Sequence, residues 1–511
     1  MFVVCLILCL LILIITYITQ YKNNYWKNKN IPYVKPLLIF GNYKKYLCLK
    51  KSVCEIDSEM CKEFPNEPFF GAFYGTEPTL IVQDLDYIRT ILVKDFYYFN
   101  SREIANYTNK EVITTNIFFS YGDNWKIMRQ SVTPLFSALK MKKMFYLVEE
   151  CTTVLEKVIE KEITQPVTEV KQMMAGFTID TIGSCIFGVS ADALENNTNV
   201  FRRLGKTIFE TSNFMTYKLI GRSMWPAIFY GLGFTVYTNE LLNFFHVLLD
   251  KVFKQRQYIE SGRNDFVDLL ITLKRKKCLH GDSITDKNGE SRKIVKEITD
   301  ELLYAQCVAF FSAGFETSSS TLSHTLYELA KNPEAQEKAI AEVDDYFTKN
   351  ERLTYECVQE TPYLSACFNE TMRLYPVLGV LTREVVEDYK LPSGEILDKG
   401  VRIHIPVYSI HRNPDYFPDP ECYRPERFVG DGKDNIKRFS YMPFGEGPRQ
   451  CLGMRFGIMQ MTAGLMTVLR KCRLELAEGM PDKLEFEPRA VVVTQTKGGV
   501  YLKLIPRDNV V

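Results

Sequence analysis

The chain has 511 residues, of which 63 are Lys or Arg and 62 are Asp or Glu, so its formal net charge is +1 at pH 7. This balance excludes a nucleic-acid-binding protein that works by bulk positive charge, and it excludes an acidic disordered chain. Hydrophobic residues make up 46% of the chain and aromatic residues 13%, which is ample for a large apolar core or pocket.

The first segment of the chain is expected to anchor it in a membrane. Residues 1–21 contain no charged side chain, and about twenty helical residues cross the apolar core of a bilayer. Lys22, Lys27 and Lys29 follow, and positive charge after a first span holds the following chain in the cytosol. A cleaved signal peptide is the alternative, but its basic start and small-residue cleavage site are missing here. Residues 22–36 are expected to form a basic, proline-containing linker.

Helical patterns predominate after this linker. Apolar residues recur at helical spacing over four long stretches, residues 142–163, 239–259, 297–330 and 334–349. Thr299, which two acidic residues follow, is a typical N-cap for the third of these helices.

A further apolar stretch, residues 219–236, is interrupted by glycines and a proline. Such a segment is too short and too broken to cross a bilayer. We expect it to lie at the membrane interface, and a core loop with short helices is the alternative.

Strand patterns are fewer, and they occur in residues 71–82, 385–406 and 484–505. In the last range, alternation through Val493, a turn at Gly498-Gly499 and a second alternating run predict a hairpin. The polar stretch 274–292 is expected to be a solvated loop; a nuclear signal is the alternative, which a membrane anchor makes improbable. Because the expected sheets draw on both ends of the chain, residues 37–511 are predicted to form one large domain, mainly α with small β-sheets.

Residues 313–318, inside the third long helix, read Ala-Gly-Phe-Glu-Thr-Ser. Gly314 in a helix interior costs about 1 kcal/mol relative to alanine, and Glu316 and Thr317 are unexpected in an apolar stretch. A surface turn of an amphipathic helix would explain the glutamate but not the glycine.

Two further motifs place charged residues at fixed spacing. Residues 370–373 read Glu-Thr-Met-Arg, and Glu370 and Arg373 share one helix face, where they can pair. The alternative is a surface ion pair worth well under ~1 kcal/mol. The second motif, Pro-Glu-Arg-Phe, places Arg427 later in the chain.

Residues 444–453 read Phe-Gly-Glu-Gly-Pro-Arg-Gln-Cys-Leu-Gly. The glycines allow a loop to approach a metal closely, and Phe444 and Leu452 supply apolar cover. Cys451 comes just before an expected helix, whose amino-terminal dipole favours a thiolate. Arg449 is a cation for the anionic edge of a cofactor. The other cysteines are scattered without a CxxC pair, which indicates buried thiols and makes a zinc site unlikely.

This decapeptide resembles the haem-binding loop of the cytochrome P450 family and matches each of its fixed positions. Three further motifs resemble the family's and occur in its order: Trp125 with Arg129 on one helix face, residues 313–318, and Glu370-x-x-Arg373 with Arg427. The resemblance implies a haem-thiolate monooxygenase that holds haem b, iron protoporphyrin IX, with Cys451 as the axial ligand of the iron.

The resemblance also implies roles for individual residues. The expected haem contacts are Arg102, Trp125, Arg129, Ala313, Arg383, Phe444, Arg449, Cys451 and Gly453. Thr317 is expected to deliver a proton during oxygen activation, with Glu316 as a relay, and Gly314 to open a groove for dioxygen. Glu370, Arg373 and Arg427 are expected to form a buried network that fixes the Cys451 loop. The expected pocket residues, some of which belong to the core, are Phe118, Phe119, Phe310, Phe311, Phe315, Val377 and Leu381.

The implied reaction inserts one atom of dioxygen into a lipophilic small molecule, and the second atom leaves as water. No GxGxxG fingerprint or P-loop is present, so electrons are expected from NADPH through a diflavin NADPH–cytochrome reductase, or from a cytochrome b-type donor. Four basic residues are candidates for the docking patch, with ordinary surface charge as the alternative: Lys126, Lys437, Arg438 and Arg455.

The pattern is most similar to insect microsomal, xenobiotic-metabolising members, which implies the endoplasmic reticulum membrane and no nucleic acid. Two alternatives differ in chemistry: a haem-thiolate isomerase or dehydratase of peroxides, and a non-catalytic haem sensor or carrier. Relatives of the first kind commonly lack the acid–threonine pair, and a sensor needs no oxygen-activating groove, so Glu316 and Thr317 argue against both.

Overall fold

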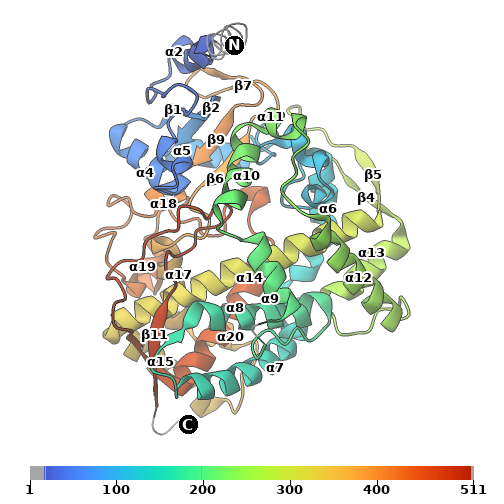
Figure 1. The fold of residues 1–511 in the computed structure, drawn as a ribbon, viewed down its shortest axis with the longest axis vertical. Coiled ribbons are helices and arrows are strands. Elements are labelled where there is room, and N and C mark those ends of the chain that lie inside the picture. The colour runs from blue at the N-terminus through green and yellow to red at the C-terminus, as the bar shows by residue number, and fades with distance from the viewer. Residues whose placement is uncertain (1–15, 18, 197, 508–511) are drawn as a thin grey trace, which may run out of the picture.

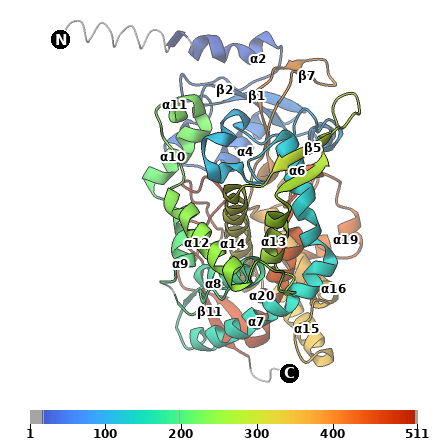
Figure 2. The same ribbon diagram turned by 90° about the vertical axis from the view of Figure 1, so that its right-hand side faces the viewer.

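The computed structural model describes residues 16–17, 19–196 and 198–507, and these form a mainly helical body with small sheets (Figures 1 and 2). The longer helices are α4 (Val53–Glu63), α6 (Gly122–Val132), α7 (Ala138–Glu162), α8 (Val170–Ile182), α9 (Val200–Ile208), α10 (Asn213–Met224), α11 (Pro226–Gly231), α12 (Asn239–Gln255), α13 (Phe266–Lys276), α14 (Asp300–Lys331), α15 (Pro333–Lys349), α17 (Pro362–Leu374) and α20 (Met454–Lys471). The shorter ones are α2 (Tyr25–Asn28), α3 (Lys44–Leu47), α5 (Leu85–Arg89), α16 (Cys357–Glu360), α18 (Val407–Ile410) and α19 (Asp431–Asp434).

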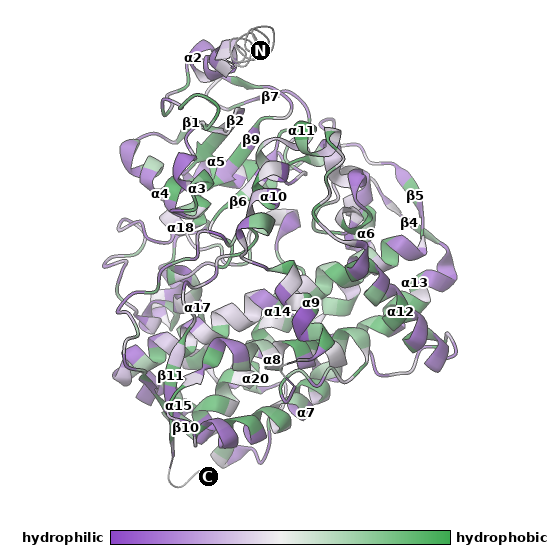
Figure 3. Ribbon diagram, in the orientation of Figure 1, coloured by the Kyte–Doolittle hydropathy of each residue, from purple (hydrophilic) through white to green (hydrophobic). Residues whose placement is uncertain are grey.

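The four long helices expected from apolar spacing are confirmed as α7, α12, α14 and α15. Thr299 caps α14 as predicted, since its Oγ1 accepts a hydrogen bond from Leu302 N at 3.2 Å. Helix α14 runs through the middle of the molecule and packs against α8, α12, α17 and α20 (Figures 1 and 2). Every residue of α8 from Met173 to Ile182 is buried, and α8 and α20 are coloured mostly hydrophobic in Figure 3.

The largest sheet has four strands in the order β1-β2-β9-β6. Its strands are β1 (Phe69–Tyr74), β2 (Glu77–Val82), β6 (Leu381–Glu384) and β9 (Arg402–Ile405). Strands β1 and β2 form an antiparallel hairpin that turns at Gly75, whose φ is +67°. The strand region expected over 71–82 is therefore two strands. Strand β2 also pairs in parallel with β9, with Thr79 opposite Arg402, so distant parts of the chain share this sheet.

The predicted hairpin over 484–505 is wrong in its pairing. Strand β11 (Tyr501–Pro506) follows the expected turn, but it pairs with β10 (Cys472–Leu476) and β3 (Thr168–Glu169). The segment before the turn forms no strand that pairs with β11: Phe486 bridges to Thr496 within it, and Thr494 bonds to another part of the chain. Its N donates to Val377 O and its Oγ1 to Pro376 O, each at 2.9 Å.

The stretch 274–292 is more ordered than the predicted solvated loop. Helix α13 continues to Lys276, and β4 (Cys278–Asp282) then pairs with β5 (Lys293–Glu297) in an antiparallel hairpin. The hairpin packs beside α6, and its Leu279 is buried. The strands could not be recognised from the sequence, because the side of the hairpin that faces water is rich in polar residues. In residues 385–406, short strands occur as expected: β7 (Tyr389–Lys390), β8 (Ile396–Leu397) and β9.

The apolar stretch 219–236 contains the end of α10, all of α11 and the turn that follows. Ile228, Leu232 and Phe234 are exposed there. Among the described residues, none of the helices combines the length and the apolar character needed to cross a bilayer. Most of the expected anchor, residues 1–21, lies outside the described residues.

Candidate active site

The loop that carries Cys451 is shaped by a backbone hydrogen bond and by glycines. Cys451 N donates to Phe444 O at 2.8 Å, which closes the loop. Gly445 and Gly447 have φ angles of +69° and +74°, and a Cβ on Gly447 would collide with the carbonyl oxygen of Leu92. Only glycine satisfies both constraints. The loop therefore presents Cys451 just before the start of α20.

The side chain of Cys451 is accessible, yet it lies within a recess of the protein. Burial raises the pKa of the Cys451 thiol, while the Gly453 N–H and the charges of Arg129 and Arg102 lower it. These three groups are positioned to stabilise a thiolate, which is the form that binds metals.

Four arginines surround the same recess: Arg102, Arg129, Arg383 and Arg449. Burial lowers the pKa of Arg102 to about 10 and that of Arg383 to about 9, and it lowers the pKa of Arg129 and Arg449 as well. Within the part of the chain that the structure describes, none of the four forms an ion pair with a carboxylate. Burying a charge without an opposite charge costs free energy, so an anionic ligand would stabilise this arginine cluster.

Arg449 is the best fixed of these arginines. Its Nε donates to Asn100 O at 2.7 Å, and its Nη2 donates to Ser120 O. Its guanidinium lies 4.6 Å from the ring centre of Trp125, a distance at which a cation is attracted to an aromatic face. Arg102 donates through Nη1 to Phe118 O at 2.6 Å, whereas Arg383 Nε is buried without a partner.

Helix α14 presents one accessible stripe in an otherwise buried surface. Ala313 is exposed, and Ala309, Phe310, Gly314 and Thr317 are half-buried, while most residues on the other sides are buried. Their spacing of three and four residues places them on one face. Thr317 Oγ1 donates to Ala313 O at 2.6 Å, so the stripe carries a hydroxyl group.

Gly314 does not interrupt α14, which is one continuous α-helix. A Cβ on Gly314 would lie 2.9 Å from Ile182 Cδ1 on α8. The glycine therefore has a packing role, since it lets α8 approach α14 closely. The groove for dioxygen that was predicted at Gly314 stays a prediction. Near the same turn, a Cβ on Gly457 would lie 3.9 Å from Ser318 Oγ. Helix α14 therefore approaches the first turn of α20, which follows the Cys451 loop, at the residue next to Thr317.

Glu316 does not lie on the accessible stripe. Its side chain is buried, and its Oε1 accepts from Lys171 Nζ on α8 at 2.8 Å. Lys171 Nζ also donates to Ser319 and Ser320. The structure therefore separates the two members of the predicted acid–threonine pair, and the proton relay through Glu316 stays a prediction. Lys171 was missed because nothing in its spacing connects it with a residue so much later in the chain.

The predicted charged network is present, with Glu370 and Arg373 fully buried and Arg427 half-buried. Arg373 donates to both carboxylate oxygens of Glu370 at 2.8 Å, and Arg427 Nε donates to Glu370 Oε1 at 3.3 Å. Neither Glu370 nor Arg373 has exposed surface. Arg373 also donates to the carbonyl oxygens of His411, Pro420 and Cys422.

His411 connects this network with the Cys451 loop, and sequence reasoning missed it. Its carbonyl oxygen accepts from Arg373 Nη1 at 2.9 Å, and its Nε2 accepts from Met442 N at 2.9 Å. Met442 O then accepts from Gly445 N at 3.0 Å. A continuous set of hydrogen bonds therefore runs from Arg373 to the loop, which gives the predicted role of the network a structural basis.

The cytochrome P450 family model matches residues 31–502 of this chain. This chain belongs to the cytochrome P450 family. It is 34% identical to cytochrome P450 6B2 of Helicoverpa armigera, over 95% of each chain. It is also 34% identical to cytochrome P450 6k1 of Blattella germanica, over 93% of this chain and 91% of the relative. A probable cytochrome P450 6w1 of Drosophila melanogaster is 32% identical over 93% and 92%.

Cytochrome P450 proteins carry a cysteine-ligated haem, and the residues of this recess fit that group. The Cys451 loop supplies a thiol, and the Gly453 N–H and the charges of Arg129 and Arg102 offset part of the rise in its pKa that burial causes. The arginines without carboxylate partners match the two propionate groups of a haem, and the orphaned Arg383 Nε is a free donor for one of them. The guanidinium of Arg449 lies over the ring of Trp125, another residue expected to contact the haem.

The expected pocket residues of this cytochrome P450 divide into two groups. Phe118 and Phe119 are half-buried and stand edge to face, with ring centres 4.9 Å apart. The half-buried group also includes Phe310 and Leu381. Phe311 has no exposed surface and packs on the core rings of Phe187 and Phe245, which is the environment expected for the members of this set that belong to the core. Phe315 and Val377 are likewise buried.

The buried His411 of this network makes the free energy of unfolding depend on pH, in one direction. Burial, with Arg373 and Arg412 nearby, lowers the pKa of His411 to about 3, whereas an unfolded histidine titrates near about 6.5. Between these values only the unfolded chain takes up the proton, so stability is complete above about pH 6.5 and falls toward pH 3, by up to ~1.4 kcal/mol per pH unit. Urea unfolding at pH 7 and pH 5 should show a smaller difference for His411→Asn than for the natural chain.

The exposed His280 on β4 provides the control. His280→Asn makes the same substitution at an exposed position, so it controls for the exchange of histidine for asparagine itself. An unchanged difference in His411→Asn would contradict the assignment.

Proposed function

We propose that this cytochrome P450 is a monooxygenase that inserts one atom of dioxygen into lipophilic organic substrates and releases the other as water. The observation that carries this proposal is the Cys451 recess with its unpaired arginines, set close to the accessible α14 stripe that bears Thr317. When bound, the haem supplies oxygen activation, and its thiolate ligand favours cleavage of the O–O bond.

The residues of the chain then have distinct tasks. Cys451 holds the iron, and the arginines neutralise the anionic edge of the cofactor. Phe118 and Phe119 form an apolar wall, which supports a lipophilic substrate. Thr317 holds a hydroxyl hydrogen on the accessible side of α14, where it can move a proton toward reduced oxygen. The hydrogen bonds through Glu370, Arg373 and His411 hold the Cys451 loop in place. The reaction itself takes place in the recess.

Replacing Thr317 by alanine tests the proposal. Electron supply and haem binding depend on other residues, so NADPH consumption should fall less than product formation. A positioned proton donor contributes about 10²- to 10⁴-fold to the rate of a reaction, so its loss should lower product formation strongly. Reduced oxygen that is not used for product should leave as hydrogen peroxide. The measurement is the ratio of product to NADPH consumed, with hydrogen peroxide assayed in parallel.

Thr325→Ala is the matched control, because Thr325 makes the same hydrogen bond one helix turn back, to Thr321 O at 2.8 Å, but is fully buried. An unchanged ratio in Thr317→Ala would mean that its hydroxyl only supports the helix. A haem sensor or a peroxide isomerase would show no substrate-dependent NADPH consumption even in the natural chain, which separates these alternatives from a monooxygenase.

The electron source is proposed to be NADPH through a diflavin reductase, with a cytochrome b-type protein as a second donor. Lys437, Arg438 and Arg455 are exposed, and Arg455 lies in the first turn of α20, directly after the Cys451 loop. With Lys126 they supply positive charge for an acidic partner surface. Ordinary surface charge is the alternative, and it predicts that reversing these charges leaves the dependence of the rate on reductase concentration unchanged.

Residues 1–21 are proposed as a single membrane anchor of the endoplasmic reticulum, residues 22–36 as its linker, and residues 37–511 as a cytosolic catalytic domain. The exposed Ile228, Leu232 and Phe234 support a second contact with the membrane interface. Flotation with phospholipid vesicles after removal of residues 1–30 tests that contact, and a chain that stays wholly in the aqueous fraction would refute it. Xenobiotic lipophiles are the proposed substrate class.

A further inference from the structure

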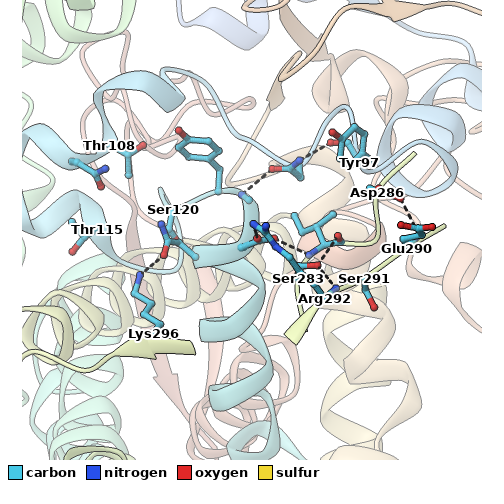
Figure 4. Close-up of a pocket in the computed structure, with 17 residues that line it drawn as sticks. Tyr97, Thr108, Thr115, Ser120, Ser283, Asp286, Glu290, Ser291, Arg292 and Lys296 are labelled. Carbon is cyan, nitrogen blue, oxygen red and sulfur yellow. Dashed lines mark hydrogen bonds and ion pairs between the residues drawn. The ribbon is translucent and has the colours of Figure 1, made fainter. Parts of the chain in front are cut away.

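A polar cavity of about 670 Å³ lies outside the Cys451 recess (Figure 4). It is lined by the loop around Thr108 and Thr115, by the start of α6 and by residues of the β4–β5 hairpin. Hydroxyl, amide and charged side chains dominate its lining, unlike the apolar wall expected for a lipophilic substrate. Its volume is in the range that binds small organic molecules.

One end of the cavity carries a cation without an acidic partner. Lys296 on β5 donates through Nζ to Asn124 Oδ1 at 2.9 Å. Among the described residues it has no carboxylate within ion-pair distance, and burial lowers the pKa of its ammonium group. In Figure 4, Ser120, Thr108 and Thr115 lie at this same end. A partly buried ammonium group that meets only neutral oxygens is incompletely stabilised, and an anion would complete its surroundings.

Two further features at this end favour an anion. Residues 121–124, at the amino terminus of α6, line the cavity, and α6 has no side-chain cap. Gly122 N donates to Asn100 Oδ1 at 2.9 Å, whereas the first N–H groups beyond it lack partners within the helix. Independently, Ser120 is 5% exposed and its Oγ is buried without a hydrogen-bond partner. It is a donor that a ligand could use.

The other end of the cavity is acidic. Asp286 and Glu290 lie there, beside Tyr97 (Figure 4). Asp286 Oδ1 accepts from the backbone N of Asn288 and of Glu290 at 2.9 Å each, which leaves lone pairs on both carboxylates. The third acid, Asp123, is already engaged, since it accepts from Ile284 N at 2.9 Å and from Arg292 Nη2 at 3.4 Å.

We propose that this cavity binds a phosphate ester whose alcohol part carries an ammonium or hydroxyl group. The phosphate group contacts Lys296, the Ser120 hydroxyl and the amino terminus of α6, and the donor group contacts Asp286 and Glu290. The site borders the haem recess, because the carbonyl oxygens of Ser120 and Asn100 hold Arg449. No residue of the expected substrate pocket or of the proposed reductase patch lines it.

Isothermal titration calorimetry of the haem-loaded, full-length protein with O-phosphoethanolamine tests the proposal. Lys296→Met should weaken binding about 10- to 100-fold, because it removes a charge-assisted hydrogen bond. Lys293→Met is the matched control: the same strand loses the same charge, but Lys293 is exposed and pairs with Asp282 at 2.7 Å on the outer side. The affinity of Lys293→Met for O-phosphoethanolamine should match that of the natural chain.

Two additional variants separate the two ends of the site. Ser120→Ala should weaken binding several-fold without lowering the melting temperature, since its hydroxyl has no partner to lose. Glu290→Gln should weaken the binding of O-phosphoethanolamine but not that of inorganic phosphate, which lacks the donor group. Absence of binding by the natural chain would overturn the proposal. Equal losses in Lys296→Met and Lys293→Met would also overturn it, because they would indicate nonspecific attraction.

Discussion

Replacing Cys451 by serine should abolish the reduced carbon monoxide absorption band that marks thiolate-ligated haem, and product formation with it. The substitution keeps the hydrogen bond from the backbone N–H of residue 451 to Phe444 O, so the loop itself should survive. What is lost is the sulfur ligand, whose thiolate form the Gly453 N–H and the charges of Arg129 and Arg102 stabilise. The measurement is the difference spectrum of the reduced protein with and without carbon monoxide.

Cys422 provides the control for this experiment, because it is another described cysteine with an accessible side chain. Cys422→Ser should keep the full band, since Cys422 contributes only its carbonyl oxygen to Arg373. If Cys451→Ser kept the band at its natural position, another residue would have to be the ligand.

Replacing Glu370 by glutamine should destabilise the protein by ~3–5 kcal/mol, the usual effect of removing one partner from a buried ion pair. Arg373 would remain with no exposed surface and no opposite charge, and Arg427 would lose the same carboxylate. Because hydrogen bonds lead from Arg373 through His411 to the Cys451 loop, haem retention should fall as well. Urea unfolding measures the first effect, and haem absorbance after gel filtration measures the second.

Glu337→Gln is the matched control, because Glu337 also pairs with an arginine, Arg473, but both side chains are about half exposed. An exposed pair contributes at most about 1 kcal/mol, and haem retention should not change. Equal effects of the two substitutions would mean that the Glu370 network is not a special support of the loop.

The parts of the site that could be predicted from the sequence are those set by short-range spacing. Glu370 and Arg373 must share a face wherever a helix forms there, and the glycines around Cys451 dictate a tight loop. Their burial could not be read from spacing, since the same Glu-x-x-Arg pattern also occurs on solvated helices. It follows from the chain segments that contribute the carbonyl oxygens around Arg373.

The sequence does not distinguish adjacent residues that have different environments. Phe310 is half-buried and Phe311 fully buried, although they differ by one position, because successive side chains of a helix point about 100° apart. The same rotation places Thr317 on the accessible stripe and turns Glu316 to Lys171. Strand β11 was expected to pair with its neighbour in sequence, but it found distant partners in β10 and β3. Such partners are chosen by tertiary packing, which local pattern does not contain.

The cationic recess is assembled from two widely separated parts of the chain, and this has a consequence for biosynthesis. Arg102 and Arg129 leave the ribosome early, whereas Arg383, Arg449 and Cys451 are among the last parts to be made. At about 5–20 residues per second, the first pair waits roughly tens of seconds for its counterparts. The haem must therefore bind late in synthesis. Prematurely terminated chains should contain Arg102 and Arg129 without Cys451 and should not retain haem.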